Sequence, residues 1–284
     1  MKLSVALRLG RVSNLPTVTS NVLAAVALSG SDAEWPAIAI VCVAMSLLYI
    51  AGMFLNDAFD RDIDARERPD RPIPSGQTSA IEVFAAGFTL LAFGVLTIAG
   101  LAVVTDAGWE PVVSVIVLAG LIVLYDMNHK GNRFSPFIMG LCRVGVYTTG
   151  ALATGASLCP ALLLGCGALL AYLIGLTYVA RQENLLKLTN VWPLAFLAIP
   201  FLLAPPQGHG PFAFAVYILF LGWVLRALKL VITRQIKPAV IGLIAGISLL
   251  DALFIVRLDH PVMAAIAVGA FVLTTIFQRK IPGT

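Results

Sequence analysis

Long apolar runs separated by short polar stretches dominate the chain from one end to the other. A transmembrane helix needs about 20 mostly apolar residues to cross roughly 30 Å of hydrocarbon, and most of these runs approach that length. The pattern predicts an all-α membrane protein, a polytopic bundle of nine or ten transmembrane helices around a lipid-accessible central cavity. The predicted segments are 12–30, 36–55, 80–104, 111–127, 134–153, 159–180, 189–204, 211–232, 239–256 and 261–278.

The segment 189–204 is the least regular of these. Pro193 and Pro200 interrupt it, and a proline inside a helix removes a backbone hydrogen bond and bends the helix. A re-entrant segment in place of a tenth crossing is therefore an open alternative. The chain contains no sign of a soluble domain, a low-complexity tail or a fixed-period repeat, so residues 1–284 are predicted to form a single transmembrane domain.

Composition and charge agree with this prediction. Hydrophobic residues make up 59% of the chain and charged residues 12%, and the mean hydropathy is +0.93, which is far above that of a soluble domain. The net charge of +4 comes from Lys and Arg residues that fall in alternate loops. The opposite loops, near 31–35, 105–110, 154–160 and 205–210, contain neither residue, and Arg257 is the one exception outside the predicted segments.

Positively charged loops stay on the cytoplasmic side of a membrane. We therefore expect an integral membrane protein, in the bacterial inner (cytoplasmic) membrane, with both termini and the basic loops in the cytoplasm. The positive charge is explained by topology, so no nucleic-acid binding is predicted.

The densest polar stretch, 56–64, ends the second apolar segment. A helix turns by about 100° per residue, so Asp62 points away from a narrow face shared by the other polar residues. Carboxylates crowded on one face repel one another and raise each other's pKa unless a divalent cation lies among them. The spacing therefore predicts a metal site on the cytoplasmic side. The residues that share the face are Asn56, Asp57, Asp60 and Asp64.

This stretch leads into Arg68-Pro69-Asp70-Arg71-Pro72-Ile73-Pro74-Ser75-Gly76. The pattern Asn-Asp-x-x-Asp-x-x-x-Asp followed by that loop resembles the first aspartate-rich motif and adjoining loop of the UbiA superfamily of intramembrane prenyltransferases, and within it most closely the EboC-like branch. The length, the predicted helices and the Asn14-x-Pro16 and Asn21 positions resemble it too. The resemblance implies transfer of an isoprenyl group from an isoprenyl diphosphate donor to an aromatic or polycyclic small-molecule acceptor, among membrane lipids, with Mg²⁺ as cofactor.

The resemblance also implies roles for residues of this first motif. Asp60 and Asp64 would be catalytic, and Asn21 would contact the substrate. Arg68 and Arg71 would bind phosphate or close the loop, with plain anchoring of a cytoplasmic loop as the alternative. The residues expected to bind Mg²⁺ and diphosphate are Asn56, Asp57, Asp60 and Asp64.

A second loop, 125–133, is similar to the family's Tyr-to-Lys loop. Lys130 would contact the diphosphate as a catalytic residue, and Tyr125 would line the pocket. Asp126 would either join the metal shell or act as a base toward the acceptor. His129 is interpreted as a polar loop residue.

Two charges fall inside apolar segments. An unpaired cation there costs on the order of several kcal/mol, so Arg143 is expected to face the cavity and meet an anion of the substrate. A structural pairing with an aspartate or a helix-end carbonyl is the alternative. Asp251 is left unassigned, with a pairing to Arg257 and a place in the distal cavity both open.

The region 175–184 departs from the family pattern, which has several aspartates there. Only Glu183 is acidic, and it is the one candidate for a further metal ligand. Tyr178 is expected to contact substrate, and Arg181 to supply positive charge in place of a second metal. Arg181 and Glu183 could equally be solvated groups at a helix end. One Mg²⁺, held mainly by 56–64, is therefore expected.

Two functions follow from these observations. The first is an Mg²⁺-dependent prenyltransferase. The second is a non-catalytic membrane carrier or flippase that retains the lipid-diphosphate pocket, because the second acidic motif is so weak.

Overall fold

The computed structural model describes residues 1–182 and 191–281, and every regular element in these ranges is helical. The all-helical prediction is thus confirmed for this part of the chain. The α-helices are α1 (Leu3–Leu9), α2 (Leu15–Ser29), α3 (Trp35–Phe59), α4 (Arg61–Glu67), α5 (Ala80–Thr105), α6 (Glu110–Asn128), α7 (Ser135–Ala153), α8 (Pro160–Arg181), α9 (Ile199–Leu203), α10 (Pro211–Ile232), α11 (Ile236–Val256) and α12 (Pro261–Phe277). Two 3₁₀ helices, η1 (Val12–Asn14) and η2 (Trp192–Ala198), complete the set.

Six of the described helices are long and apolar enough to cross a membrane: α3, α5, α6, α8, α10 and α11. Helices α2 and α12 are shorter, α7 carries Arg143, and the segment predicted at 189–204 contains only the η2 and α9 pieces in its described part. Each predicted segment therefore contains helical structure, but a count of nine or ten crossings stays a prediction.

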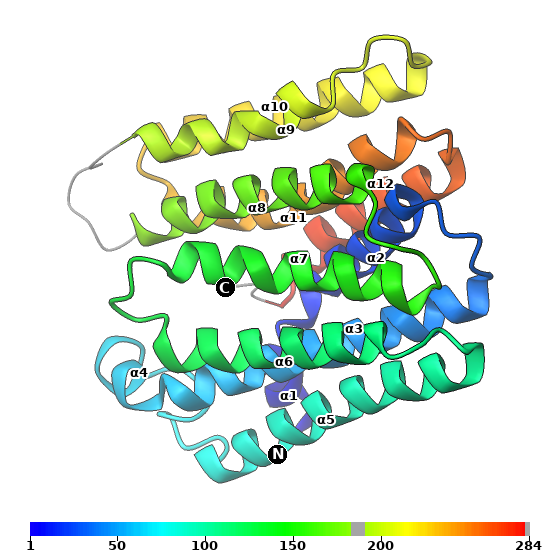
Figure 1. The fold of residues 1–284 in the computed structure, drawn as a ribbon. Coiled ribbons are helices and arrows are strands. Elements are labelled where there is room, and N and C mark those ends of the chain that lie inside the picture. The colour runs from blue at the N-terminus through cyan, green and yellow to red at the C-terminus, as the bar shows by residue number, and fades with distance from the viewer. Residues whose placement is uncertain (183–190, 282–284) are drawn as a thin grey trace.

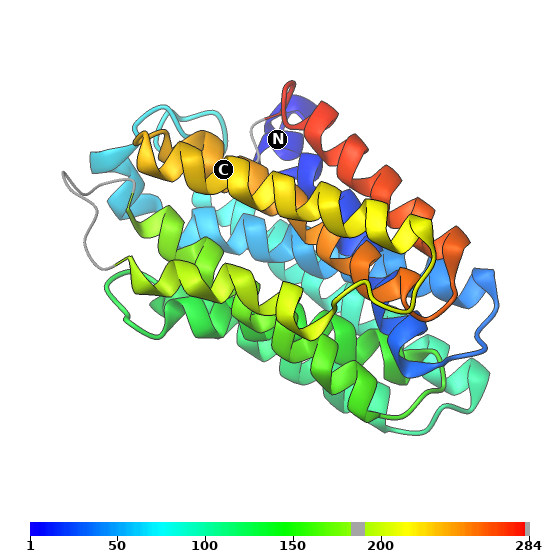
Figure 2. The same ribbon diagram turned by 90° about the horizontal axis from the view of Figure 1, so that it is seen from above.

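The long helices run side by side along one direction, as Figures 1 and 2 show. Helix α11 packs against α2, α8, α10 and α12, and most of its side chains are buried. Helix α5 lies at the edge against α3 and exposes apolar side chains such as Leu96 and Val103, which are 64% and 83% exposed. A wide apolar surface of this kind suits contact with lipid.

Glycine allows α5 to approach α3 closely. A Cβ atom at Gly94 would lie 2.7 Å from Leu48 Cγ, and a Cβ atom at Gly87 would lie 2.9 Å from Leu55 Cγ. Small residues at such positions let membrane helices pack backbone to backbone. The close packing holds the C-terminal end of α3, where the acidic stretch begins, against a fixed neighbour.

The start of α5 fixes the end of the loop that follows α4. Ser79 Oγ accepts a hydrogen bond from the Glu82 backbone N–H, and the Glu82 carboxylate accepts one from the Ser79 backbone N–H, both at 3.2 Å. This reciprocal cap satisfies two N–H groups that the first helical turn leaves free. The loop from Arg68 to Thr78 is therefore held between two helix ends.

The connections that carry basic residues gather at one end of the bundle. Figure 1 shows α4, the α6–α7 connection and the α10–α11 connection at that end. Arg68 directly after α4, Lys130 of the α6–α7 connection and Lys237 in the first turn of α11 border one cavity. The opposite end has a hollow bordered by acidic residues, among them Asp32 and Asp106. The charge asymmetry expected from the loops is therefore present between the two ends of the fold.

Candidate active site

The polar residues of the first motif lie where α3 runs into α4. Backbone hydrogen bonds from Asp60 to Asn56 (3.0 Å) and from Asp64 to Asp60 (2.8 Å) continue the helical repeat across the junction. The side chain of Asp62, by contrast, is 80% exposed. Four side chains consequently share one buried face, with exposed fractions of 8% for Asn56, 7% for Asp57, 5% for Asp60 and 1% for Asp64. We call these four the acidic face.

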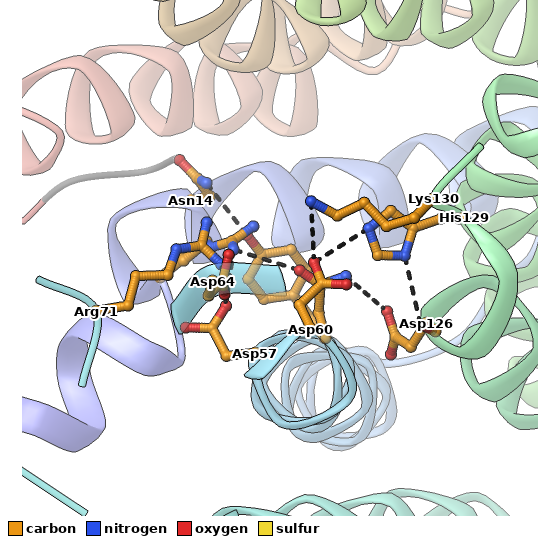
Figure 3. A network of polar contacts seen from close by, with 11 residues as sticks. Asn14, Asp57, Asp60, Asp64, Arg71, Asp126, His129 and Lys130 are labelled. Carbon is orange, nitrogen blue, oxygen red and sulfur yellow. Dashed lines mark hydrogen bonds and ion pairs between the residues drawn. The ribbon is translucent and has the colours of Figure 1, made fainter. Parts of the chain in front are cut away.

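Two arginines cover part of the acidic face. Arg71 Nη1 lies 3.0 Å from Asp57 Oδ1 and 2.8 Å from Asp64 Oδ2, so one guanidinium joins two carboxylates (Figure 3). Arg11 Nη2 lies 3.1 Å from the same Asp57 oxygen. The backbone of Arg11 has a φ of 41°, in a left-handed region that non-glycine residues rarely adopt and that is often found at functional sites. Arg11 is not among the residues that the sequence predicted for the site.

The α6–α7 connection supplies a histidine and a lysine that contact Asp60. His129 Nε2 lies 3.2 Å and Lys130 Nζ 3.6 Å from Asp60 Oδ2, as Figure 3 shows. Burial raises the pKa of Asp60, but the His129 hydrogen bond and the charges of His129, Lys130 and Arg71 outweigh it and lower the pKa below its ordinary value. Sequence reasoning treated His129 as a plain loop residue, whereas its ring contacts the acidic face and stacks on Tyr125 with centroids 5.0 Å apart.

Asp64 has the opposite balance. Burial raises its pKa, the Arg71 charge and hydrogen bond oppose that rise, and the neighbouring Asp57 and Asp60 add to it, leaving the pKa above its ordinary value. Its Oδ1 atom is buried without a hydrogen-bond partner among the described residues. Asp126 is similar: Oδ1 accepts from Asn56 Nδ2 at 3.2 Å, and Oδ2 has no such partner.

These oxygens are suitable ligands for a hard cation. Asp64 Oδ1 and Asp126 Oδ2 have lone pairs that no hydrogen bond satisfies within the described ranges, and Mg²⁺ binds carboxylate oxygen by preference. No group of three Asp, Glu, His or Cys side chains in these ranges is already arranged to enclose a metal ion. The donor atoms fit the ion, and the remaining ligands would have to come from water or from a bound phosphate.

A cavity of about 580 Å³ opens beside the acidic face. Polar and charged side chains surround one part of it, and Leu173, Val240 and Ile247 of α8 and α11 border another. A smaller apolar pocket adjoins it, with Tyr49, Tyr125 and Arg143 bordering both. The residues predicted for the site that border the larger cavity are Asn56, Asp60, Arg68, Arg71, Tyr125, Lys130, Arg143 and Arg181.

Arg143 is buried at this boundary. Its Nη1 donates to Asn21 Oδ1 at 2.8 Å, its Nη2 donates to Thr17 Oγ1 at 3.1 Å, and the guanidinium lies 5.3 Å from the Tyr49 ring centroid. Its direct partners in the described residues are therefore neutral side chains, and not the aspartate or helix-end carbonyl of the structural alternative. The contact with an anion of the substrate stays a prediction. Asn21 lies beneath Arg143 instead of at the cavity wall, since it does not border either pocket.

The region of the weak second motif is partly described. Arg181 donates to Ser135 Oγ at 2.6 Å and to the carbonyl oxygen of Asn132, and so joins α8 to the α6–α7 connection. Tyr178 is partly buried on α8 and does not border either pocket. Glu183, the remaining acidic candidate, lies outside the described residues.

Comparison with known proteins finds one matching family and several similar enzymes. The model of the UbiA prenyltransferase family matches residues 15–241. The chain is 32% identical over 145 residues to digeranylgeranylglyceryl phosphate synthase of Methanosarcina barkeri. That alignment covers 49% of this chain and 46% of that protein. It is 36% identical over 129 residues to chloroplastic chlorophyll synthase of Arabidopsis thaliana, covering 44% and 33%. The alignments thus span about a third to a half of these relatives' lengths.

Solved structures share the fold over nearly the whole chain. The apo structure of a UbiA homolog from Aeropyrum pernix K1 superposes with a TM-score of 0.67 at 18% identity, covering 85% of this chain and 97% of that one. A UbiA homolog from Archaeoglobus fulgidus bound to GPP and Mg²⁺ gives a TM-score of 0.53 at 14% identity, covering 96% and 99%. At these identities the likeness shows a common helical fold.

Proposed function

Because the chain belongs to the UbiA prenyltransferase family, we propose that it transfers an isoprenyl group from an isoprenyl diphosphate to a small-molecule acceptor within the membrane. The observation that carries this proposal is the joining of two environments in one cavity. The Asp60 carboxylate and several cationic side chains border one part, and leucine, isoleucine and valine side chains border the other. An isoprenyl diphosphate has the same two halves, a highly charged head and an apolar tail.

Mg²⁺ is the proposed cofactor of the acidic face. Asn56, Asp57, Asp60 and Asp64 would hold the ion, with Asp126 next to them through its hydrogen bond to Asn56. Mg²⁺ is usually bound by one or two carboxylates plus substrate phosphates and water, which agrees with unpartnered oxygens that do not yet enclose an ion. When bound, it neutralises charge on the diphosphate. The homolog from A. fulgidus, solved with GPP and Mg²⁺, supports this choice.

Basic side chains would bind the diphosphate directly. Arg71 and Lys130 hold the acidic carboxylates before substrate enters, and Arg68 and Arg181 border the same cavity. When the bond between C1 of the prenyl chain and the diphosphate oxygen breaks, the oxygen keeps the electron pair. Donors already in position stabilise that growing charge without reorganisation.

The apolar part of the cavity would shield the prenyl cation from water. The acceptor then forms its new bond to C1 and loses a proton. Asp126 borders the apolar pocket and has an unpartnered Oδ2 atom within the described structure, so it is the side chain we assign to receive that proton.

Finer features of the proposal come from the sequence. We expect an aromatic or polycyclic acceptor, membership of the EboC-like branch, and nine or ten transmembrane helices. We also expect both termini and the site to face the cytoplasm of a bacterial inner membrane. The clustering of basic connections at the end of the bundle that holds the acidic face supports this orientation.

The test uses the purified full chain in lipid vesicles with geranylgeranyl diphosphate, and a lipid extract of the native membranes as the source of acceptor. We expect diphosphate release, and a prenylated product by mass spectrometry, only when both Mg²⁺ and the extract are present. Binding of the donor without any release under these conditions would reject the transferase and favour the carrier or flippase alternative.

A further inference from the structure

A second polar cluster lies between α2, α7 and α11. Asp251 of α11 is 0% exposed and Arg143 of α7 is 8% exposed, and both lie within apolar helices. Asn21 of α2 connects them: its Oδ1 accepts from Arg143 Nη1 at 2.8 Å, and its Nδ2 donates to Asp251 Oδ2 at 2.8 Å. Ionisable residues within a membrane bundle are costly and usually have a function. We call these three residues the interior network.

The hydrogen bonds of the interior network indicate its charge. Asp251 accepts from Ser20 Oγ and from Tyr147 OH, each at 2.5 Å, in addition to Asn21. Hydrogen bonds donated to a carboxylate favour its ionised form, and arginine is always charged. The Asn21 amide therefore accepts from the Arg143 cation and donates to the Asp251 anion. The positive and negative charges cancel, so the interior network is neutral as a whole.

Arg143 retains hydrogen-bonding capacity toward the cavity. A guanidinium has five N–H groups, and the described partners of Arg143 are one oxygen of Asn21 and one of Thr17. Its Nε atom has no described partner and is not among the fully buried atoms without one, so the Nε–H group is reachable from the cavity and pocket that Arg143 borders. This deep position thus offers a fixed donor to a ligand oxygen.

We propose that Arg143 binds a carbonyl oxygen of an uncharged acceptor, and that Asp251 is a positioning residue that holds Arg143 through Asn21. An anion here would add an uncompensated negative charge to a neutral network in apolar surroundings, which is strongly unfavourable. A carbonyl oxygen satisfies the Nε–H donor without adding charge. The inference rests on the proposed function, since it assigns the acceptor to the cavity that would hold the donor.

Two naphthalene compounds of nearly the same shape test the inference: the ketone 2-acetylnaphthalene and the carboxylate 2-naphthoate. Their dissociation constants are measured with the full chain in detergent. Wild-type protein should bind the ketone at least about tenfold more tightly than the carboxylate, and Arg143→Gln should weaken ketone binding by about tenfold.

The Asp251→Asn variant tests whether Asp251 positions Arg143 and balances its charge or has a merely structural role. It leaves the Arg143 charge uncompensated, so this variant should bind 2-naphthoate more tightly than 2-acetylnaphthalene, the reverse of the wild-type order. A structural role alone would weaken both compounds equally. The matched control is Ser114→Ala, which removes a hydroxyl bonded to Thr149 at 2.8 Å between α6 and α7, and which should bind like wild type.

Four results would overturn the inference or its assignment of Asp251: neither compound binds wild type, wild type binds both equally, Arg143→Gln binds the ketone as tightly as wild type, or Asp251→Asn weakens both compounds equally. If Asp251→Asn does not fold, Arg143→Gln decides alone. Diphosphate release in the same preparations keeps the two proposals apart. Transfer with ketone binding that is insensitive to Arg143 rejects only this inference, and Arg143-dependent binding without transfer rejects only the proposed function.

Discussion

The acidic face and the interior network place charges in apolar surroundings in two different ways. On the acidic face, cations contact carboxylates directly, as Arg71 does with Asp57 and Asp64. In the interior network an amide separates Arg143 from Asp251. The first arrangement lies beside a cavity bordered by several further cations. In the second, Asn21 and Asp251 are fully buried, and Arg143 is the member that borders the cavity.

The difference indicates two purposes. Cations on the acidic face can exchange a carboxylate for a phosphate oxygen, because both are anions and the cavity gives access. Asp251 is completely buried and has three donors, so no ligand can replace it. The acidic face is therefore suited to binding and release, and the interior network to holding one geometry.

The largest effect is expected from removal of the buried acid. Asp251→Ala leaves Arg143 without its counter-charge and leaves Ser20, Asn21 and Tyr147 without their acceptor. Breaking one side of a buried charge pair costs about 3–5 kcal/mol, and we expect a loss of that order in the free energy of unfolding, measured by denaturant titration in detergent.

A double variant sharpens this prediction. Asp251→Leu combined with Arg143→Met removes both charges, and the loss should be clearly smaller than the sum of the two single losses. Additive losses would mean that Asn21 does not couple the two charges, and the contrast with the acidic face would then fail.

The next effect concerns catalysis. Asp60→Asn should leave the protein folded, because Asp60 lies beside a cavity and not in the packed interior. Diphosphate release should fall on the order of a hundredfold, as when a charge-stabilising group is removed from an active site. Asp62→Asn, two residues away with an exposed side chain, should release diphosphate at the wild-type rate, and equal loss in both variants would contradict the assignment.

Arg71→Lys is expected to have an intermediate effect. Arg71 Nη1 alone contacts both Asp57 and Asp64, and a lysine ammonium has no second nitrogen with which to contact a diphosphate oxygen at the same time. Affinity for the donor, measured by competition with labelled geranylgeranyl diphosphate, should fall by about tenfold. Arg61→Lys is the control: Arg61 forms an ion pair with the exposed Asp62 at 3.6 Å, a kind of pair that contributes little.

The acidic face and the interior network also differ in how far the sequence could predict them. Asn56, Asp57, Asp60 and Asp64 belong to one helical stretch, so their common face follows from the helical repeat alone. The second loop could be placed beside them only by resemblance to a family. The same local periodicity identified the helices, although the number that cross the membrane depends on lengths that the apolar pattern does not fix.

The interior network has no such local signal. Asn21, Arg143 and Asp251 come from three helices whose neighbourhood is a property of the packed bundle. The pairing of Asp251 with Arg257 that the sequence left open is not what the structure has, since Arg257 Nη1 donates to the Leu203 carbonyl at 3.1 Å. Arg11 was overlooked for the same reason, because its contact with Asp57 spans two separate elements.

The smallest effect is a pH dependence within the acidic face. The folded-state pKa of Asp60 is lowered, with its cationic partners outweighing burial, so its stabilising contribution is present above its unfolded pKa of about 4 and is lost as the pH falls. The pKa of Asp64 is raised, mainly by burial, so its contribution has the opposite sign: it is present below about pH 4 and is lost as the pH rises through the folded-state pKa.

Melting temperatures between pH 3 and pH 7, measured in detergent with a chelator, separate the two carboxylates. Asp60→Asn should lose less stability than wild type on acidification, because the contribution that acid removes is already absent. Asp64→Asn should lose less than wild type as the pH rises from 3, because no buried carboxylate has to ionise. Asp62→Asn should follow the wild-type curve, since its side chain is solvated in both states. If Asp60→Asn and Asp64→Asn shifted the curve in the same direction, the two carboxylates would not have the opposite environments described here, and the acidic face would titrate as one unit.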